Sequence, residues 1–269
     1  MKRIKKLDEQ TINRIAAGEI IHRPANALKE LLENSLDAGS SNVQVTVKDG
    51  GLKLLQITDN GCGIDRQDLN LLCERFATSK LTKFEDLCGI QTFGFRGEAL
   101  ASISHVAHLS VKTKTQNSNC AWVASYSDGK LLSEPKGSAG NQGTQLTVQD
   151  LFYNVIARKK ALKNVTEEYN RILTVMQAYA VHHPTCAFQC KKQSASSFDL
   201  STPSNSSVLN NLSFLFGNSI GKNLIHVLEN NQKLHFSISA YISNSSYNSK
   251  KFQLLLFINS KHVINQFIT

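Results

Sequence analysis

The 269-residue sequence lacks the cysteine pattern of a disulfide scaffold or of a zinc site. Its six cysteines are scattered, and only Cys186 and Cys190 lie close together, spaced as C-x-x-x-C. A structural zinc site normally needs a second close pair of ligands, and the sequence offers none. We therefore interpret these two cysteines as strand residues and expect no disulfide framework.

The sequence also lacks any apolar run long enough to cross a bilayer as a helix. Its N-terminal stretch, MKRIKKLDEQ, is basic but has no apolar core of the kind found in signal peptides. We therefore expect a soluble, intracellular protein with no membrane partner. The basic cluster in that stretch fits a nuclear signal, a phosphate contact or, most simply, a solvated tail. Its members are Lys2, Arg3, Lys5 and Lys6.

Acidic residues are in the minority, with 21 Asp and Glu against 30 Lys and Arg, which gives a formal net charge of +9. Such an excess favours contact with polyanions such as nucleic acid, nucleotides or anionic lipid. A solvated basic surface explains the charge equally well, so charge alone does not assign a partner. The length is sufficient for one large domain or for one and a half ordinary ones.

Hydrophobic periodicity predicts an α+β protein. The first half is expected to contain helices at 8–18 and 24–38, strands at 42–48 and 52–58, a helix at 65–75, a lid at 78–97 and a helix at 98–105. Strands at 107–115, 121–127 and 143–148, one beginning at Leu131, a helix at 166–182 and a strand at 186–192 complete it. This order is not a strict βαβ alternation. It predicts a two-layer sandwich in which helices cover one face of a mixed, mainly antiparallel sheet.

The composition changes after the last of these strands. Residues 194–207 are rich in Ser and Asn and weakly apolar, which predicts a linker or flexible loop. A helix at 209–216 and strands at 235–242 and 252–259 are expected beyond it. We therefore divide the chain into a first domain at 1–205 and the start of a second, incomplete α/β domain at 206–269.

Polar residues on the helix at 24–38 form the first candidate site. Glu30, Asn34 and Asp37 share one face of this helix. An Asn amide oxygen is a hard ligand for Mg²⁺, and a carboxylate one turn earlier could orient or deprotonate a water molecule. Taken alone, however, the pattern is better explained as a solvated helix surface.

The turn DNGCG, at 59–63, is the second candidate site. It can be an ordinary connection between a strand and a helix, since Asn-Gly is common in turns. Alternatively, Asp59 at a strand end accepts a hydrogen bond from a ring amine such as that of adenine. Gly61 and Gly63 would then let the base approach the backbone.

Glycines before a predicted helix form the third candidate site, in the stretch GFRGE at 94–98. It matches neither the Walker A loop nor G-x-G-x-x-G. Backbone N–H groups at a helix N-terminus can nevertheless bind an anion. The stretch Thr78-Ser79-Lys80 adds hydroxyls and a charge, and Thr144 adds a hydroxyl at the start of a strand. Each signal alone is weak.

The order of these motifs along the chain resembles that of the nucleotide-binding motifs in the GHKL ATPases. This superfamily includes gyrase-type topoisomerases, Hsp90 chaperones, histidine kinases and MutL. The stretches NRIAAGEII, ELLENSLDAGS, ITDNGCGI, FATSKL and TFGFRGEALASI resemble the MutL mismatch-repair family in particular. Further stretches resemble the eukaryotic branch that supplies the shared subunit of the MutL heterodimers. The resemblance extends from about Leu7 to Val263 and thins in 194–207.

This resemblance implies the Bergerat (GHKL) ATPase fold with ATP and Mg²⁺ as ligands. It assigns Glu30 as the general base, Asn34 as the Mg²⁺ ligand, and Asp59 with Thr144 to adenine, with room provided by Gly61 and Gly63. The remaining nucleotide-binding residues that it implies are Thr78, Ser79, Lys80, Gly94, Phe95, Arg96, Gly97, Glu98, Ala99 and Leu100.

The resemblance also implies a slow ATPase that acts as a switch in DNA mismatch repair in the nucleus. ATP orders the lid, the N-terminal regions of two protomers associate, and this couples mismatch recognition to downstream repair. The implied partners are a second MutL homologue, MutS-type mismatch-recognition proteins and DNA bound with little sequence preference. Candidate DNA phosphate contacts are Arg158, Lys159, Lys160 and Lys163, although a solvated loop explains them equally well.

The sequence departs from the family pattern near its end. The family's second domain supplies a lysine within a motif like N-V-H-P-x-K, and this motif, the C-terminal dimerisation region and an endonuclease motif are absent from the sequence. We therefore expect a fragment or a short form. The alternative function is a nucleotide-gated interaction module with negligible turnover. A chaperone or histidine kinase is disfavoured because no phosphoacceptor helix pair precedes the boxes.

Overall fold

The main sheet dominates the fold in the computed structural model, which describes residues 4–81, 83–89, 92–247 and 253–263. The strand order is β5-β4-β3-β7-β2-β1-β8-β9, and β6 pairs with β4. The strands are β1 (Asn42–Lys48), β2 (Leu54–Asp59), β3 (His108–Lys114), β4 (Ala121–Ser127), β5 (Lys130–Leu131), β6 (Lys136–Ser138), β7 (Gly143–Gln149), β8 (Ala187–Lys192) and β9 (Leu200–Thr202). Strands β1 and β8 pair in parallel, whereas the other neighbours in the sheet are antiparallel.

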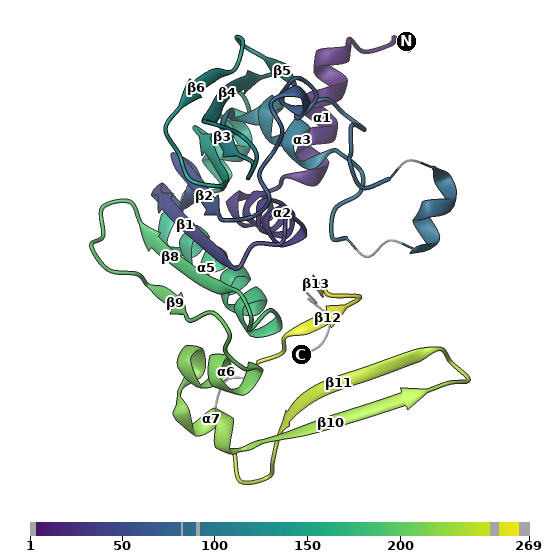
Figure 1. The fold of residues 1–269 in the computed structure, drawn as a ribbon, viewed down its shortest axis with the longest axis vertical. Helices are drawn as coiled ribbons and strands as arrows, with labels where there is room; N and C mark the ends of the chain where they lie inside the picture. Colours follow the sequence, from purple (N-terminus) through teal and green to yellow (C-terminus); the bar gives the residue numbers. More distant parts are fainter. Residues whose placement is uncertain (1–3, 82, 90–91, 248–252, 264–269) are drawn as a thin grey trace.

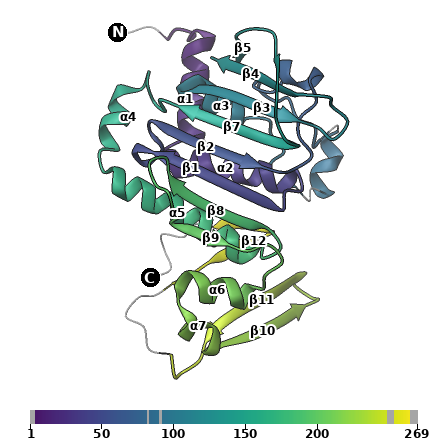
Figure 2. The same ribbon diagram turned by 60° about the vertical axis from the view of Figure 1, so that its left-hand side comes forward.

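Helices cover one face of this sheet (Figures 1 and 2). They are α1 (Glu9–Ile20), α2 (Pro24–Asp37), α3 (Ala99–Val106), α4 (Ile156–Ala161) and α5 (Val165–His182). As the sequence indicates, the Asp8 side chain caps α1 by accepting a hydrogen bond from the Thr11 N–H at 2.9 Å, and Pro24 begins α2. The predicted α+β sandwich is therefore the observed architecture.

The core lies between α2 and the sheet. Leu28, Leu31 and Leu32 of α2 are fully buried, as are the alternating Val43 and Val45 of β1. Burying each such side chain contributes about 1.5–3 kcal/mol. This packing fixes the rotation of α2 about its axis, so its polar face is directed away from the sheet core.

Several local predictions are wrong. The helix expected at 65–75 is only the short 3₁₀ turn η2 (Gln67–Asn70), followed by further i→i+3 hydrogen bonds such as Glu74 N–H to the Leu71 carbonyl at 3.0 Å. The Leu69 carbonyl within this stretch accepts a hydrogen bond from the Tyr126 hydroxyl at 2.7 Å. The expected loop at 194–207 contains β9, which pairs with β8 at the sheet edge and buries Leu200. The solvated loop that was the alternative explanation for the basic residues at 158–163 is partly helical, as α4. The strand expected at 52–58 runs instead over β2, because Leu52 closes the 3₁₀ turn η1 (Asp49–Gly51).

The region after residue 206 forms separate small elements. These are α6 (Val208–Phe216), α7 (Asn218–Lys222), β10 (Leu224–Asn231), β11 (Phe236–Ser243), β12 (Leu256–Ile258) and β13 (Lys261–Val263). Strands β10 and β11 pair with each other, as do β12 and β13. The sequence did not predict β10, and the strand predicted at 252–259 starts outside the described residues. The domain boundary at 205 stays a prediction. None of the described helices is long and apolar enough to cross a membrane.

Candidate active site

The polar face of α2 supplies the centre of the site. Glu30 lies one helical turn before Asn34, as the spacing predicts. Burial raises the pKa of the Glu30 carboxyl, and the negative charge of Glu33 raises it further, while Lys29 partly offsets both effects. A carboxylate with a raised pKa is a better proton acceptor near neutral pH, so the environment of Glu30 suits a general base.

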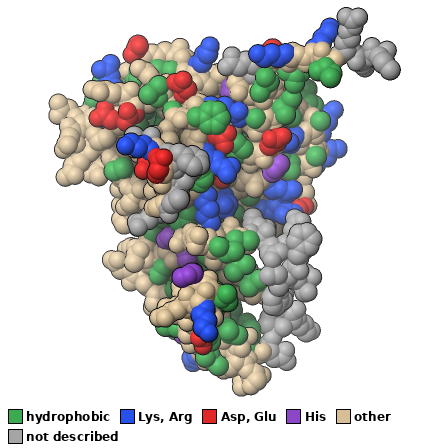
Figure 3. All heavy atoms as spheres, turned by 90° about the vertical axis from the view of Figure 1, so that its right-hand side faces the viewer, with side chains coloured by type: hydrophobic (Ala, Val, Ile, Leu, Met, Phe, Trp, Pro, Cys, Tyr) green, Lys and Arg blue, Asp and Glu red, His purple; other side chains and the backbone are tan. Residues whose placement is uncertain are grey.

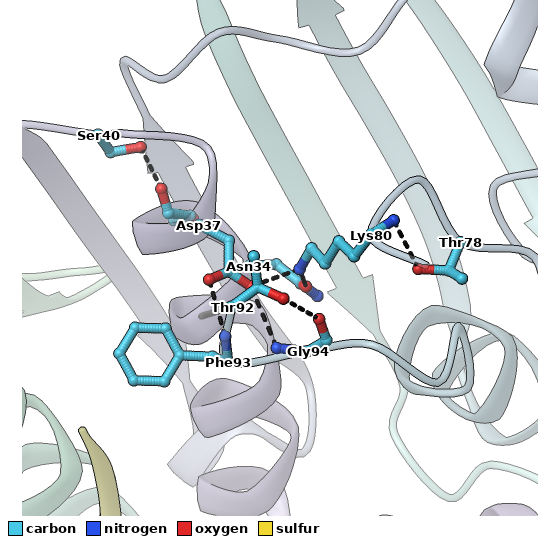
Figure 4. Close-up of polar contacts among 9 residues, drawn as sticks. Asn34, Asp37, Ser40, Thr78, Lys80, Thr92, Phe93 and Gly94 are labelled. Atoms are coloured by element: carbon cyan, nitrogen blue, oxygen red, sulfur yellow. Dashed lines mark hydrogen bonds and ion pairs between the residues drawn. The ribbon is translucent and has the colours of Figure 1, made fainter. Parts of the chain in front are cut away.

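Asp37, at the last turn of α2, binds the lid (Figure 4). Its Oδ1 accepts the backbone N–H of Phe93 at 2.9 Å, and its Oδ2 accepts that of Gly94 at 3.1 Å. The Lys80 ammonium pairs with the same carboxylate and donates to Asn34 Oδ1 at 3.1 Å. Two backbone donors and one cation therefore converge on a single anionic group.

Gly97, the second glycine of the lid, is required by its own backbone conformation and close packing. Gly97 has a φ of +63°, and a Cβ at this position would lie 2.2 Å from the Ala77 carbonyl oxygen. Only glycine permits this approach, which seats the start of α3 against the stretch before Thr78. Thr78 Oγ1 in turn accepts the Lys80 N–H at 3.2 Å. The two segments of the lid, the one around 77–80 and the one around 94–98, are thus in direct contact.

Asp59 ends β2 in a buried polar network. Its side chain accepts hydrogen bonds from the Gly61 N–H at 2.9 Å, the Thr144 N–H at 3.2 Å and the Ser35 hydroxyl at 2.8 Å. Burial raises the pKa of Asp59, and these donors partly offset the effect. The structure therefore brings Asp59 and Thr144 together, as expected.

The glycines of the DNGCG turn pack closely against neighbouring backbone. A Cβ on Gly61 would lie 2.8 Å from Ala38 at the end of α2, and one on Gly63 would lie 2.3 Å from the Lys114 carbonyl oxygen. These contacts within the protein already require glycine at both positions. The expected approach of a nucleotide to this backbone stays a prediction.

Comparison with known proteins identifies the family. Residues 22–135 match the model for histidine kinase-, DNA gyrase B- and HSP90-like ATPases. The chain is 48% identical, over 97% of its length, to DNA mismatch repair protein MLH1 of Saccharomyces cerevisiae, and 46% identical, again over 97%, to Mlh1 of Dictyostelium discoideum. It also resembles a crystal structure of the N-terminal domain of a DNA repair protein, with a TM-score of 0.74 and 33% identity over 90% of this chain and 75% of that one. The chain belongs to the MutL family of DNA mismatch repair proteins.

The fold of this MutL-family chain is also that of solved MutL ATPase domains. A structure described as the Aquifex aeolicus MutL ATPase domain complexed with ADP matches 92% of the chain and 85% of its own length, with a TM-score of 0.65 and 24% identity. The predicted GHKL ATPase fold is therefore confirmed. The chain spans about a third of the length of the two curated relatives, 34% in Saccharomyces and 33% in Dictyostelium.

Arg158, one of the four candidate DNA phosphate contacts, makes its contacts within the fold of this chain. Its Nη1 donates to the carbonyls of Gly18 and Ile21, each at 3.0 Å, and its guanidinium lies 5.4 Å from the centroid of the Phe152 ring. It therefore holds the C-terminal end of α1. Lys159, Lys160 and Lys163 are exposed, and they are not part of the site on α2.

Basic side chains also gather near the lid. Figure 3 shows Lys and Arg side chains over the middle of the face that carries the lid, interleaved with acidic ones. Among the predicted lid residues, Arg96 is exposed and lies over the Phe95 ring at 5.3 Å. Glu98 precedes α3, whose first residues are Ala99 and Leu100.

Sequence reasoning missed three residues that shape the site. Asp37 was placed on the correct helix face but was not recognised as the anchor of the lid. Ser35 binds Asp59, and its position inside the ELLENS box could have been a signal. Thr113 Oγ1 lies 3.0 Å from Thr144 Oγ1 and accepts the Ile64 N–H at 2.8 Å. No local pattern marks Thr113, because it reaches the site from another strand.

Proposed function

We propose that this chain binds ATP with Mg²⁺ and hydrolyses it slowly, and that ATP drives closure of the lid. The observation that carries the proposal is the convergence of donors on Asp37. The N–H groups of Phe93 and Gly94 and the ammonium of Lys80 are the kind of groups that bind a phosphate. In this structure, an acidic side chain occupies them beside Glu30 and Asn34.

The site fits a divalent cation near Asn34. Asn34 Oδ1 already accepts from a cationic group, the Lys80 ammonium, so its amide oxygen faces a position that tolerates positive charge. Asn34 is the protein ligand that we assign to Mg²⁺. When bound, this ion would neutralise charge on the phosphate oxygens.

The remaining roles are assigned from the family resemblance, and the positions of the side chains are consistent with them. Asp59 accepts a hydrogen bond from the adenine amine, and Thr144 supports it through its hydroxyl. Glu30 takes a proton from the attacking water, consistent with its raised pKa. The lid stretches 78–80 and 94–100 enclose the phosphates, mainly through backbone N–H groups. The solved relative described as complexed with ADP supports a nucleotide at this fold.

The wider function is DNA mismatch repair in the nucleus. We propose that lid closure promotes association of N-terminal regions and thereby couples mismatch recognition to downstream steps. The proposed partners are a second MutL homologue, MutS-type mismatch-recognition proteins and DNA bound without sequence preference. Membership of the MutL family supports this role. The alternative, a nucleotide-gated interaction module with negligible turnover, shares the same ATP site.

Two assays test the proposal. Calorimetry with a non-hydrolysable ATP analogue and Mg²⁺ should show binding that Asp59→Asn weakens at least about tenfold, since the variant removes a buried acceptor for the adenine amine. Steady-state phosphate release should be abolished by Glu30→Ala with binding retained. Unchanged affinity in Asp59→Asn would overturn the adenine assignment, and equal hydrolysis by Glu30→Ala would overturn the base assignment. Binding without turnover in the wild type would favour the interaction module.

A further inference from the structure

Glu33 is a buried carboxylate next to the proposed base. It lies one turn after Glu30 on α2, and only 1% of its surface is exposed. Its Oε1 accepts a hydrogen bond from the Tyr179 hydroxyl of α5 and forms an ion pair with Lys29 at 3.0 Å. A buried negative charge is tolerated only when it is paired in this way.

Tyr179 is held by aromatic contacts on two sides. The ring of the lid residue Phe93 lies 6.1 Å away in an edge-to-face arrangement. On the other side lie Phe257 at 5.7 Å and His262 at 6.2 Å, both from the β12–β13 hairpin beside the end of α5 (Figure 1). His183 stacks parallel to the tyrosine ring at 6.2 Å. Tyr179 is therefore the meeting point of α2, the lid and the hairpin.

We propose that Tyr179 is a positioning residue for Glu30, and that it acts by holding the Glu33 carboxylate one helical turn from the Glu30 carboxylate. The importance of this effect for catalysis rests on the proposed function, in which Glu30 is the base. The hairpin and Phe93 keep the tyrosine hydroxyl directed at Glu33. The described part of the region after residue 206 thereby supports the catalytic face of α2 through its contacts with Tyr179.

The charges around the pair set the expected sign. Glu30 is influenced by Glu33 and Lys29 of α2, by Lys261 of β13 and by Lys80 of the lid. Glu33 raises the pKa of Glu30, whereas the three lysines lower it. On the other side, Glu33 is faced by Tyr179 and His262. Burial raises the pKa of the Tyr179 hydroxyl, so it remains a proton donor.

The test is a ¹³C-carboxyl NMR titration of the nucleotide-free protein, with the Glu30 signal assigned through Glu30→Gln. Tyr179→Phe keeps the ring but removes the hydroxyl that donates a hydrogen bond to Glu33, so the negative charge of Glu33 is held less firmly near Glu30. The pKa of Glu30 should fall by on the order of half a pH unit. Glu33→Gln removes that charge directly and should shift the pKa in the same direction.

The matched control is Tyr169→Phe, on the same helix. The Tyr169 hydroxyl also donates to a carboxylate, Asp199, at 2.5 Å, but on a different part of the fold. This variant should leave the Glu30 titration unchanged. In hydrolysis assays, Tyr179→Phe should lower kcat by no more than about threefold at neutral pH, leave KM unchanged and move the acidic limb of the kcat profile to lower pH.

The outcomes separate the two proposals. An unchanged Glu30 titration in both Tyr179→Phe and Glu33→Gln would overturn the positioning role, even if the wild type hydrolyses ATP. If the wild type did not bind ATP but both variants still shifted the Glu30 titration, the proposed function would be overturned. The link between Tyr179, Glu33 and Glu30 would remain in place. A shift of equal size in Tyr169→Phe would also overturn the positioning role, because it would indicate a general effect on α5.

Discussion

The ammonium of Lys80 donates a hydrogen bond to the Asn34 amide oxygen at 3.1 Å. This oxygen is the atom that we propose as the ligand of Mg²⁺. The same ammonium pairs with Asp37, which also binds the lid backbone. The lid therefore rests on α2 through contacts that nucleotide phosphates and their metal would replace. This relationship makes Lys80 the cation that balances the charge of Asp37 before ATP enters.

Replacing Lys80 should weaken nucleotide binding. In Lys80→Ala the charge of Asp37 is left without its cation, and it would repel the phosphates. We expect the Kd for an ATP analogue with Mg²⁺ to rise about tenfold, which corresponds to about 1.4 kcal/mol. Calorimetry checks this. Lys83→Ala, at an exposed position of the lid, is the matched control and should bind like the wild type. Equal affinity in the two variants would contradict the prediction.

Replacing Asp37 should loosen the lid. Asp37→Asn keeps the size of the side chain but removes the charge that binds two backbone N–H groups and Lys80. Hydrogen bonds to a charged acceptor are stronger than neutral ones, so amide exchange at Phe93 and Gly94 should quicken by about tenfold or more in the nucleotide-free protein. Exchange measured by NMR checks this, with the exposed Asp68→Asn as the control. Unchanged protection at Phe93 would show that Asp37 does not hold the lid.

Local periodicity predicted the parts of the fold that depend on neighbours in the sequence. The apolar stripe of α2 and the alternating valines of β1 are such features. The parallel pairing of β1 with β8 was not predictable in this way, because Val43 meets Phe188 only in the folded chain. The same limit applies at 65–75, where the contact of Leu69 with Tyr126 comes from a distant strand.

The candidate site shows the same division. Glu30, Asn34 and Asp37 could be placed on one helix face because residues three or four apart lie about one turn of 3.6 residues from each other. The pairing of Asp59 with Thr144 came from the resemblance to a family, and the structure brings the two residues together. The binding of Lys80 by Asp37 was not foreseen, because the path of the lid depends on tertiary contacts such as the approach of Gly97 to Ala77.

The proposed base should lower the stability of the nucleotide-free fold. Burial raises the pKa of Glu30 in the folded state above its usual value of 4.5, so stability is lost as the pH rises through the folded-state pKa. Glu30→Gln removes this cost. The variant should be more stable than the wild type at pH 7.5, with the gain vanishing near pH 4. Urea unfolding at both pH values checks this, and the exposed Glu134→Gln should show no such gain. A gain that persists at low pH would contradict the electrostatic cause.

Substitutions at Arg158 and at its lysine neighbours should affect different properties. The first should change stability, and the second should change DNA binding. Arg158 donates to the Gly18 and Ile21 carbonyls, so Arg158→Ala should lower the free energy of unfolding by about 1–3 kcal/mol while changing DNA affinity little. Lys159 and Lys160 are exposed. Replacing both by alanine should leave stability unchanged and reduce the slope of log K against log salt by about two, because each lysine would otherwise neutralise one phosphate. Anisotropy with a short duplex at several salt concentrations, together with urea unfolding, measures both effects. If Arg158→Ala reduced the salt slope at unchanged stability, Arg158 would have to be returned to the DNA-binding surface, and its two carbonyl contacts would not be what fixes the end of α1.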